Sequence, residues 1–178
     1  TGGKLHPTKG YVMQRFVAAC SHPEELTEIL AQIAHDPSLS ARFLNTLARL
    51  EYVGVRKMLK ARRAETLDLN GLQHMLEEAH HALRLKRAAI SAAPHAEDVA
   101  TFSPAHTLCG DEAERYFQVV DRASKEATDS RSLSNPDLNY VLTSVAIEIR
   151  AQSFYPALLG QLGELPSARV VRSVLGDE

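Results

Sequence analysis

The sequence has few cysteines and no long apolar run. Its 178 residues include two cysteines, Cys20 and Cys109, which do not form a C-x-x-C pair. Two cysteines so far apart indicate neither a zinc site nor a disulfide framework, which favours a cytoplasmic protein. No apolar run approaches the roughly 20 residues needed to cross a bilayer, and residues 1–4 lack the apolar core of a signal peptide. We therefore expect no membrane partner.

The sequence also lacks an excess of positive charge. Twenty Lys and Arg residues against 22 Asp and Glu residues give a formal net charge of −2. Because nucleic-acid binding needs clustered positive charge, no nucleic-acid partner is expected. No Gly-rich phosphate loop, nucleophile motif or internal repeat narrows the choice of substrate. With 44% hydrophobic and 24% charged residues, the composition is typical of one globular domain, which we assign to residues 1–178.

Apolar residues recur at spacings of three and four along nearly the whole chain, and this pattern predicts an all-α fold. Polar caps and prolines at the first helical positions mark most of the helix starts. The predicted caps are Ser21, Asp36, Asp68 or Asn70, and Asn135. The segment 91–106 contains two prolines and is predicted to be a connection; fully extended, it could reach about 50 Å, enough for a crossover along a bundle. Pro156 should kink or end the last long helix. The predicted helices span about 23–35, 37–63, 68–90, 107–125, 136–156 and 166–175.

Three long helices place a glutamate inside an otherwise apolar stripe. Moving an ionised carboxylate into a core costs several kcal/mol, so each glutamate needs a partner. A metal ion is the strongest such partner, followed by arginine or histidine. The alternative is that each glutamate forms an ion pair or lies at the edge of its stripe. The predicted inward faces are Phe43, Leu44, Leu47, Glu51, Val55 and Met58; Met75, Glu78, His81, Ala82 and Leu85; Ala113, Tyr116, Phe117, Val120 and Ala123; and Leu138, Val141, Val145, Glu148, Gln152 and Tyr155.

Glu78 and His81 add a second indication of metal binding. Residues three apart share a helix face, so these two side chains can present an oxygen and a nitrogen to one point. Carboxylates with imidazole suit iron or manganese, whereas structural zinc more often recruits thiolates. Glu77 and His80 form the alternative register of the same motif. The sequence therefore predicts an iron or manganese site that includes Glu78 and His81.

With these residues in place, the chain resembles the ferritin-like superfamily of di-iron and di-manganese carboxylate proteins over about residues 39–162. In that pattern the first and third bundle helices each give a glutamate, and the second and fourth each give Glu-x-x-His. Glu51 matches the first position, Glu78 with His81 the second, and Glu148 the glutamate of the fourth helix. Residues 77–83 look like the corresponding stretch of uncharacterised bacterial members. The resemblance implies a four-helix bundle, here with an extra N-terminal helix and a short C-terminal helix.

The chain departs from that pattern at two positions. Ala151 stands where the second Glu-x-x-His has its histidine, so the site is predicted to be binuclear but asymmetric, mononuclear, or unable to hold metal. His106 is a candidate for the missing nitrogen ligand. The third helix offers Glu114 as its best candidate ligand, with Asp111 and Asp121 as competitors.

The resemblance implies that a metal pair activates oxygen or peroxide for oxidation of a small-molecule substrate. Two alternatives stay open: a metal-free bundle whose buried charges pair with one another, and a haem-oxygenase-like helical fold. Apolar surface on the N-terminal helix would be compatible with a homodimer. Arg150 is either a partner of a ligand carboxylate or a solvated residue. Four tyrosines are expected to lie beside the site, most simply as core residues with bonded hydroxyls: Tyr52, Tyr116, Tyr140 and Tyr155.

Overall fold

The computed structural model describes residues 23–61, 64–130 and 136–177, and every regular element in these ranges is helical. The predicted all-α class is therefore confirmed for the described part of the chain. Three short 3₁₀ helices lie between the longer ones. The elements are α2 (Pro23–His35), α3 (Pro37–Ala61), η1 (Ala64–Thr66), α4 (Leu69–Ala92), η2 (Ala96–Val99), η3 (Pro104–His106), α5 (Gly110–Asp129), α6 (Pro136–Leu162) and α7 (Pro166–Asp177).

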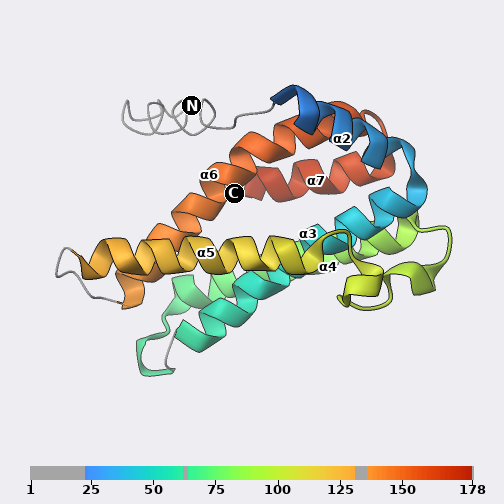
Figure 1. Cartoon of the computed structure of the whole chain (residues 1–178). Coiled ribbons are helices and arrows are strands. Elements are labelled where there is room, and N and C mark those ends of the chain that lie inside the picture. Colours follow the sequence, from blue (N-terminus) through green and yellow to red (C-terminus); the bar gives the residue numbers. More distant parts are fainter. Residues whose placement is uncertain (1–22, 62–63, 131–135, 178) are drawn as a thin grey trace, which may run out of the picture.

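The helices form two hairpins with two further helices at one end (Figure 1). The most extensive helix contact joins α3 to α4, and α5 packs against α6 as the second pair. The α2 helix packs on α3 and α6, while α7 packs on α4 and α6. The contacts of α5 and α6 with the first pair are made mainly to α3.

The hydrophobic core lies at the end where α2 and α7 meet the other helices. Leu30 of α2 is 1% exposed, and Val171 and Val174 of α7 are fully buried. The core therefore extends beyond residues 39–162, and α2 buries part of its apolar face inside the protein. The remaining buried members of this cluster are Ile33, Ala41, Leu44, Leu47, Ala48, Leu85, Ala88, Ala89, Val99, Ala151, Tyr155, Leu158, Leu162 and Ala168.

Several predicted helix starts have the expected caps. The Asp36 carboxylate accepts hydrogen bonds from the backbone N–H groups of Ser38 and Leu39, and Asp68 accepts one from Gly71. The predicted caps at residues 21 and 135, and the predicted end of a helix at residue 63, lie outside the described residues. Within the described ranges, the bounds of α2, α3 and α4 agree with the predicted ones to within about two residues.

The predicted inward face of α6 is wrong in part. Val141 and Val145 are 48% and 44% exposed, whereas Tyr140, Thr143 and Ala151 are buried. The reason is that apolar residues surround much of this helix, so the stripe could not be chosen from hydrophobicity alone. Packing against the other helices rotates α6 so that the stripe through residues 140, 143, 147, 151, 155 and 158 faces inward. The helix does not end at Pro156 but continues to Leu162.

The α5 helix begins at Gly110, three residues later than predicted, and ends at Asp129, four residues later. Thr107 donates its hydroxyl to the Ser103 carbonyl, and Cys109 adopts a left-handed conformation with φ of 54°, so the backbone turns before the helix starts. A Cβ at Gly110 would lie 2.5 Å from the Thr107 hydroxyl, which explains glycine at this position. Tyr116, predicted to face inward, is 41% exposed.

Buried polar groups hold the connection between α4 and α5. The Asn45 side chain is fully buried and donates to the carbonyl oxygens of Thr101 and His106, at 2.8 and 2.7 Å. Its carbonyl oxygen accepts a hydrogen bond from Lys86 at 2.7 Å, and burial lowers the pKa of this lysine. The connection therefore has a defined path that depends on α3 and α4.

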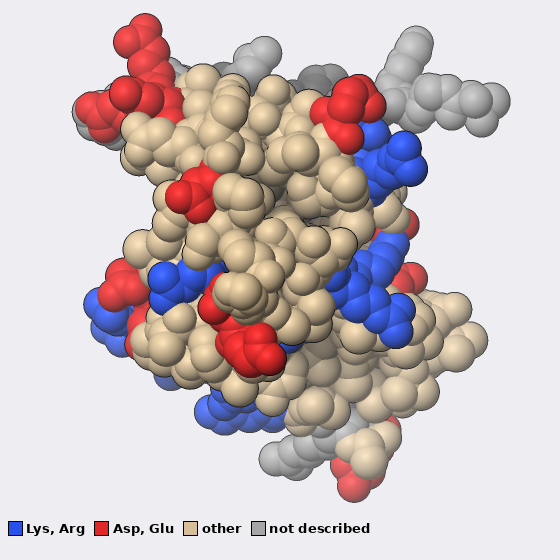
Figure 2. Space-filling view, turned by 90° about the vertical axis from the view of Figure 1, so that its right-hand side faces the viewer, with Lys and Arg blue, Asp and Glu red and all other residues tan. Residues whose placement is uncertain are grey.

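Within the described ranges, each helix is too short or too polar to cross a lipid bilayer. Figure 2 views the molecule from the right-hand side of Figure 1 and shows a largely uncharged surface on which acidic and basic side chains both occur.

Candidate metal centre

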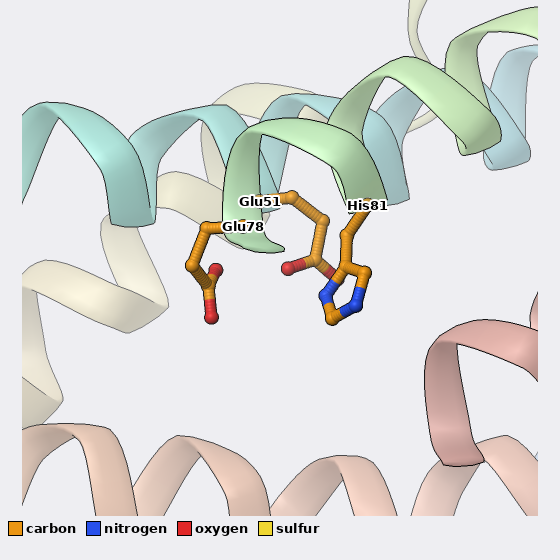
Figure 3. A group of neighbouring side chains, drawn as sticks. All are labelled: Glu51, Glu78 and His81. Atoms are coloured by element: carbon orange, nitrogen blue, oxygen red, sulfur yellow. The ribbon is translucent and has the colours of Figure 1, made fainter. Parts of the chain in front are cut away.

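Glu51 of α3 and Glu78 and His81 of α4 point to one place, on the side of these two helices that faces α6 (Figure 3). Each offers one ligand atom, and these atoms all lie within 4.8 Å of one another. His81 is 3% exposed, and both glutamates are partly buried. The structure thus brings together three of the five predicted ligands in one place.

Gly54 allows the Glu78 carboxylate to lie against α3. A Cβ at this glycine would be 2.9 Å from Glu78 Oε2, closer than real Cβ contacts. Gly54 lies almost one turn beyond Glu51 on α3, so the same helix supplies both a carboxylate and the space for its neighbour. Sequence reasoning did not identify this glycine, because its role depends on the approach of α4.

His81 is oriented by a carboxylate from another helix. Its Nε2 lies 3.3 Å from Oδ2 of Asp177, the last residue of α7, and Figure 3 shows the other ring nitrogen directed toward Glu51. Asp177 also accepts a 2.6 Å hydrogen bond from Arg84, and the bonds to Arg84 and then His81 lower the pKa of this carboxyl group. Histidines that bind metals commonly donate their second N–H to a carboxylate in this way. The arrangement leaves Nδ1 as the ligand atom.

His74 is a site residue that sequence reasoning missed. It lies one helical turn before Glu78, and its Nε2 is 3.3 Å from Glu78 Oε1, while its Nδ1 is 3.2 Å from the Tyr140 hydroxyl. The hydrogen bond to Glu78 is the main cause of a raised pKa for His74, with smaller contributions from the charges of Glu148 and Glu77. The spacing 74, 78, 81 on one helix face could have revealed this residue.

Tyr155 bonds directly to a candidate ligand. Its hydroxyl donates to Glu51 Oε1 at 3.1 Å, and the side chain is 3% exposed. Tyr140 is also buried beside the site, as predicted. Tyr52 and Tyr116, however, are 45% and 41% exposed, so the prediction that they pack in the core is wrong. Their helices turn these two rings toward the surface.

A cavity of about 280 Å³ adjoins the cluster and is lined by residues of α3, α4, α5 and α6. Glu148 of α6 lines it together with Glu51, Glu78 and His74. Ala151 also lines this cavity, at the position where the resembled pattern has histidine. The fourth predicted glutamate therefore faces the same space as the cluster, although it does not belong to the group of three.

Three acidic residues of α5 form ion pairs with basic side chains of α3. Arg49 contacts Glu114 Oε2 at 2.6 Å and Asp111 Oδ1 at 2.7 Å. Lys57 contacts Asp121 at 2.6 Å, and this bond lowers the pKa of Asp121 against the opposing effect of its desolvation. Glu114 lines the cavity, but its Oε2 binds a guanidinium. Its role as a metal ligand stays a prediction.

The remaining sequence candidates lie away from the cluster. The His106 ring lies in the connection, where its Nδ1 accepts a hydrogen bond from the Thr101 backbone N–H at 3.1 Å. Glu77 and His80 are exposed, so the structure favours the register of Glu78 and His81. Arg150 lies over the rings of α5 and α6 aromatic residues, 5.5 Å from the ring centre of Phe117.

Comparison with protein-family models, with curated proteins and with solved structures finds no match for this chain. Membership of the ferritin-like superfamily and the haem-oxygenase-like alternative both stay predictions.

Proposed function

We propose that Glu51, Glu78 and His81 bind one iron or manganese ion on the side of α3 and α4 that faces α6, and that the protein is a ferritin-like metal-binding protein. The convergence of two carboxylates and one imidazole in a partly buried position carries this proposal. The donor set fits such metals, because they accept mixed oxygen and nitrogen ligands.

The geometry needs little adjustment to close around an ion. Metal bonds to these ligand types are about 2.0 to 2.2 Å long, so donors on one ion lie about 3 to 4.3 Å apart. The ligand atoms of the three side chains lie within 4.8 Å of one another. Small rotations of the two glutamates would therefore bring the three ligand atoms to these distances, while the hydrogen bond that His81 donates to Asp177 fixes the imidazole.

Electrostatics favours a cation at this point. Glu51 and Glu78 place two carboxylates close together, and a cation between them would be attracted by both. His74 and Tyr155 each engage one of these carboxylates and restrict its rotation. A divalent ion would neutralise the pair.

Glu148 and His74 line the cavity of about 280 Å³ together with Glu51 and Glu78, two of the residues that would hold the ion. That volume could admit oxygen and a small substrate. When bound, iron or manganese would supply activation of oxygen or peroxide for an oxidation. The side chains of this chain would hold the ion, exclude bulk water and position the substrate.

The pairing of α3 with α4 and of α5 with α6 supports a ferritin-like layout, since it gives two hairpins around the acidic cavity. A metal-free binding module is the second candidate. The ion pairs of Arg49 with Glu114 and of Lys57 with Asp121 favour it, because they balance the charge of two acidic residues that line the cavity without metal.

Metal analysis of the full chain distinguishes these two candidates. Protein purified without chelator, and protein reconstituted with Fe(II) or Mn(II), should hold about one ion per chain. Glu78→Gln and His81→Gln should lower metal affinity by about 10- to 100-fold or more, because each removes a ligand.

Glu77→Gln and His80→Gln are matched controls, since these exposed neighbours carry the same chemistry on the same helix. They should bind metal like the unmodified protein. Absence of stoichiometric metal after reconstitution, or equal affinity in Glu78→Gln and Glu77→Gln, would reject the metal centre and favour the metal-free module.

A further inference from the structure

A second cavity, of about 480 Å³, lies where the junction of α2 and α3 meets α4 and the start of α7. We propose that it binds a small aliphatic anion, with a carboxylate or phosphate head group recognised by Arg87 and Arg84. Among the described residues that line it, two are arginines, three are serines and none is acidic. For a chain with a net charge of −2, this is a local concentration of positive charge.

The two arginines differ in how firmly they are held. Arg84 donates to Ser173 Oγ and to Asp177, both at 2.6 Å, so α7 fixes its guanidinium. Arg87 lies three residues later on the same helix face, is exposed, and has no acidic partner within the described residues. Arg87 therefore has its donors available for an anion, and a guanidinium suits carboxylate and phosphate oxygens.

Two buried hydroxyls line the same cavity. Ser40 is 5% exposed and Ser167 is 8% exposed. A hydroxyl group can donate a hydrogen bond to an oxygen of a carboxylate or phosphate. These two serines therefore add hydrogen-bonding groups to the lining beside the arginines.

The starts of two helices add positive potential. Pro37 near the start of α3 and Pro166 at the start of α7 both line the cavity. The N-terminal end of a helix carries a partial positive charge that favours anions. The Asp36 side chain already caps α3, so α7, with Ser167 in its first turn, is the end available to a ligand.

The rest of the lining is apolar and indicates the body of the ligand. It consists of Ala34, Ala88, Ala92, Leu165, Pro166 and Val170 among others. Cavities that bind small molecules are mostly apolar, with a few placed polar groups, and a volume of about 480 Å³ falls in their usual range. An aliphatic chain with one anionic end matches both parts of this cavity.

Calorimetric titration of the full chain with four probes tests the proposal: octanoate, octyl phosphate, octanol and inorganic phosphate. Octanoate and octyl phosphate should bind, and the tighter of the two identifies the preferred head group. Octanol and inorganic phosphate, which each lack one half of the ligand, should bind at least tenfold more weakly. Raising the salt concentration should weaken the binding of the two aliphatic anions.

Arg87→Gln should weaken octanoate and octyl phosphate about tenfold and leave octanol unchanged, because it removes a charged hydrogen bond. Arg172→Gln is the matched control on an exposed arginine of α7 outside the cavity, and it should change nothing. Ser91→Phe, which fills the cavity from an exposed lining position, should weaken both anions.

The titrations are repeated in Glu78→Gln, so that an anion bound to metal is not mistaken for one in this cavity. Unchanged anion affinity in Arg87→Gln, equal binding of octanol and octanoate, or no binding of either aliphatic anion would overturn the proposal. Failure of the metal centre would leave these results unaffected, since none of the probes requires metal.

Discussion

Replacing Gly54 by alanine tests how closely α3 and α4 must approach at the metal centre. The new Cβ would lie 2.9 Å from Glu78 Oε2 and 3.7 Å from its Cδ. The nearest atoms belong to the end of a flexible side chain, so we expect the Glu78 carboxylate to move while the helices stay in place. The carboxylate would then leave its position beside Glu51 and His81.

Two effects of Gly54→Ala have opposite consequences. Alanine is more favourable than glycine inside a helix by about 0.5 to 1 kcal/mol, so the metal-free protein should become slightly more stable. Metal affinity should fall about 10- to 100-fold, as when a ligand is misoriented. Each tenfold loss reduces the stabilisation by saturating metal by about 1.4 kcal/mol, or about 3 to 6 °C in melting temperature for a chain of this size.

The assay is thermal unfolding with chelator and with Mn(II), for Gly54→Ala and for Gly160→Ala. Gly160 is also helical, and an added Cβ there meets nothing within 4 Å, so it reports the effect of helix propensity alone. Gly160→Ala should keep the full metal-dependent rise in melting temperature, and Gly54→Ala should lose most of it. The reasoning fails if both variants keep the same metal-dependent rise.

Two further predictions concern polar residues, one buried and one partly exposed. Asn45→Ala should lower the free energy of unfolding by about 3 kcal/mol, because it removes the hydrogen bonds of the Asn45 side chain with the carbonyls of Thr101 and His106 and with the Lys86 ammonium. Urea unfolding measures this loss, with the exposed Asn70→Ala as the control. A loss below about 1 kcal/mol would contradict the prediction. The raised pKa of His74 stabilises the metal-free fold fully below the ordinary value of 6.5, and this contribution is lost as pH rises through the raised value. Above pH 6.5, the free energy of unfolding of the metal-free protein should therefore fall more steeply with rising pH than that of metal-free His74→Gln. Identical slopes in the two proteins would refute the role of His74.

The sequence by itself determined the helices and most of their ends. Apolar residues spaced three and four apart define an amphipathic helix whatever its neighbours are. Asp36 and Asp68 cap their helices by hydrogen bonds to backbone groups two or three residues later. The same local rule brought Glu78 and His81 to one face of α4, and the charge in the apolar stripe of α3 indicated Glu51. These features depend on residues within one or two turns of each other, so they can be predicted without the fold.

The tertiary structure decided which surfaces of the helices meet. The inward face of α6 was ambiguous, because apolar residues surround much of the helix and only packing selects Thr143 and Ala151. The Asp177 contact with His81 joins residues 96 positions apart, and the ion pair of Glu114 with Arg49 joins residues 65 apart. Hydrophobic periodicity carries no information about such distant pairs, since they form only where the packing of whole helices brings two side chains together.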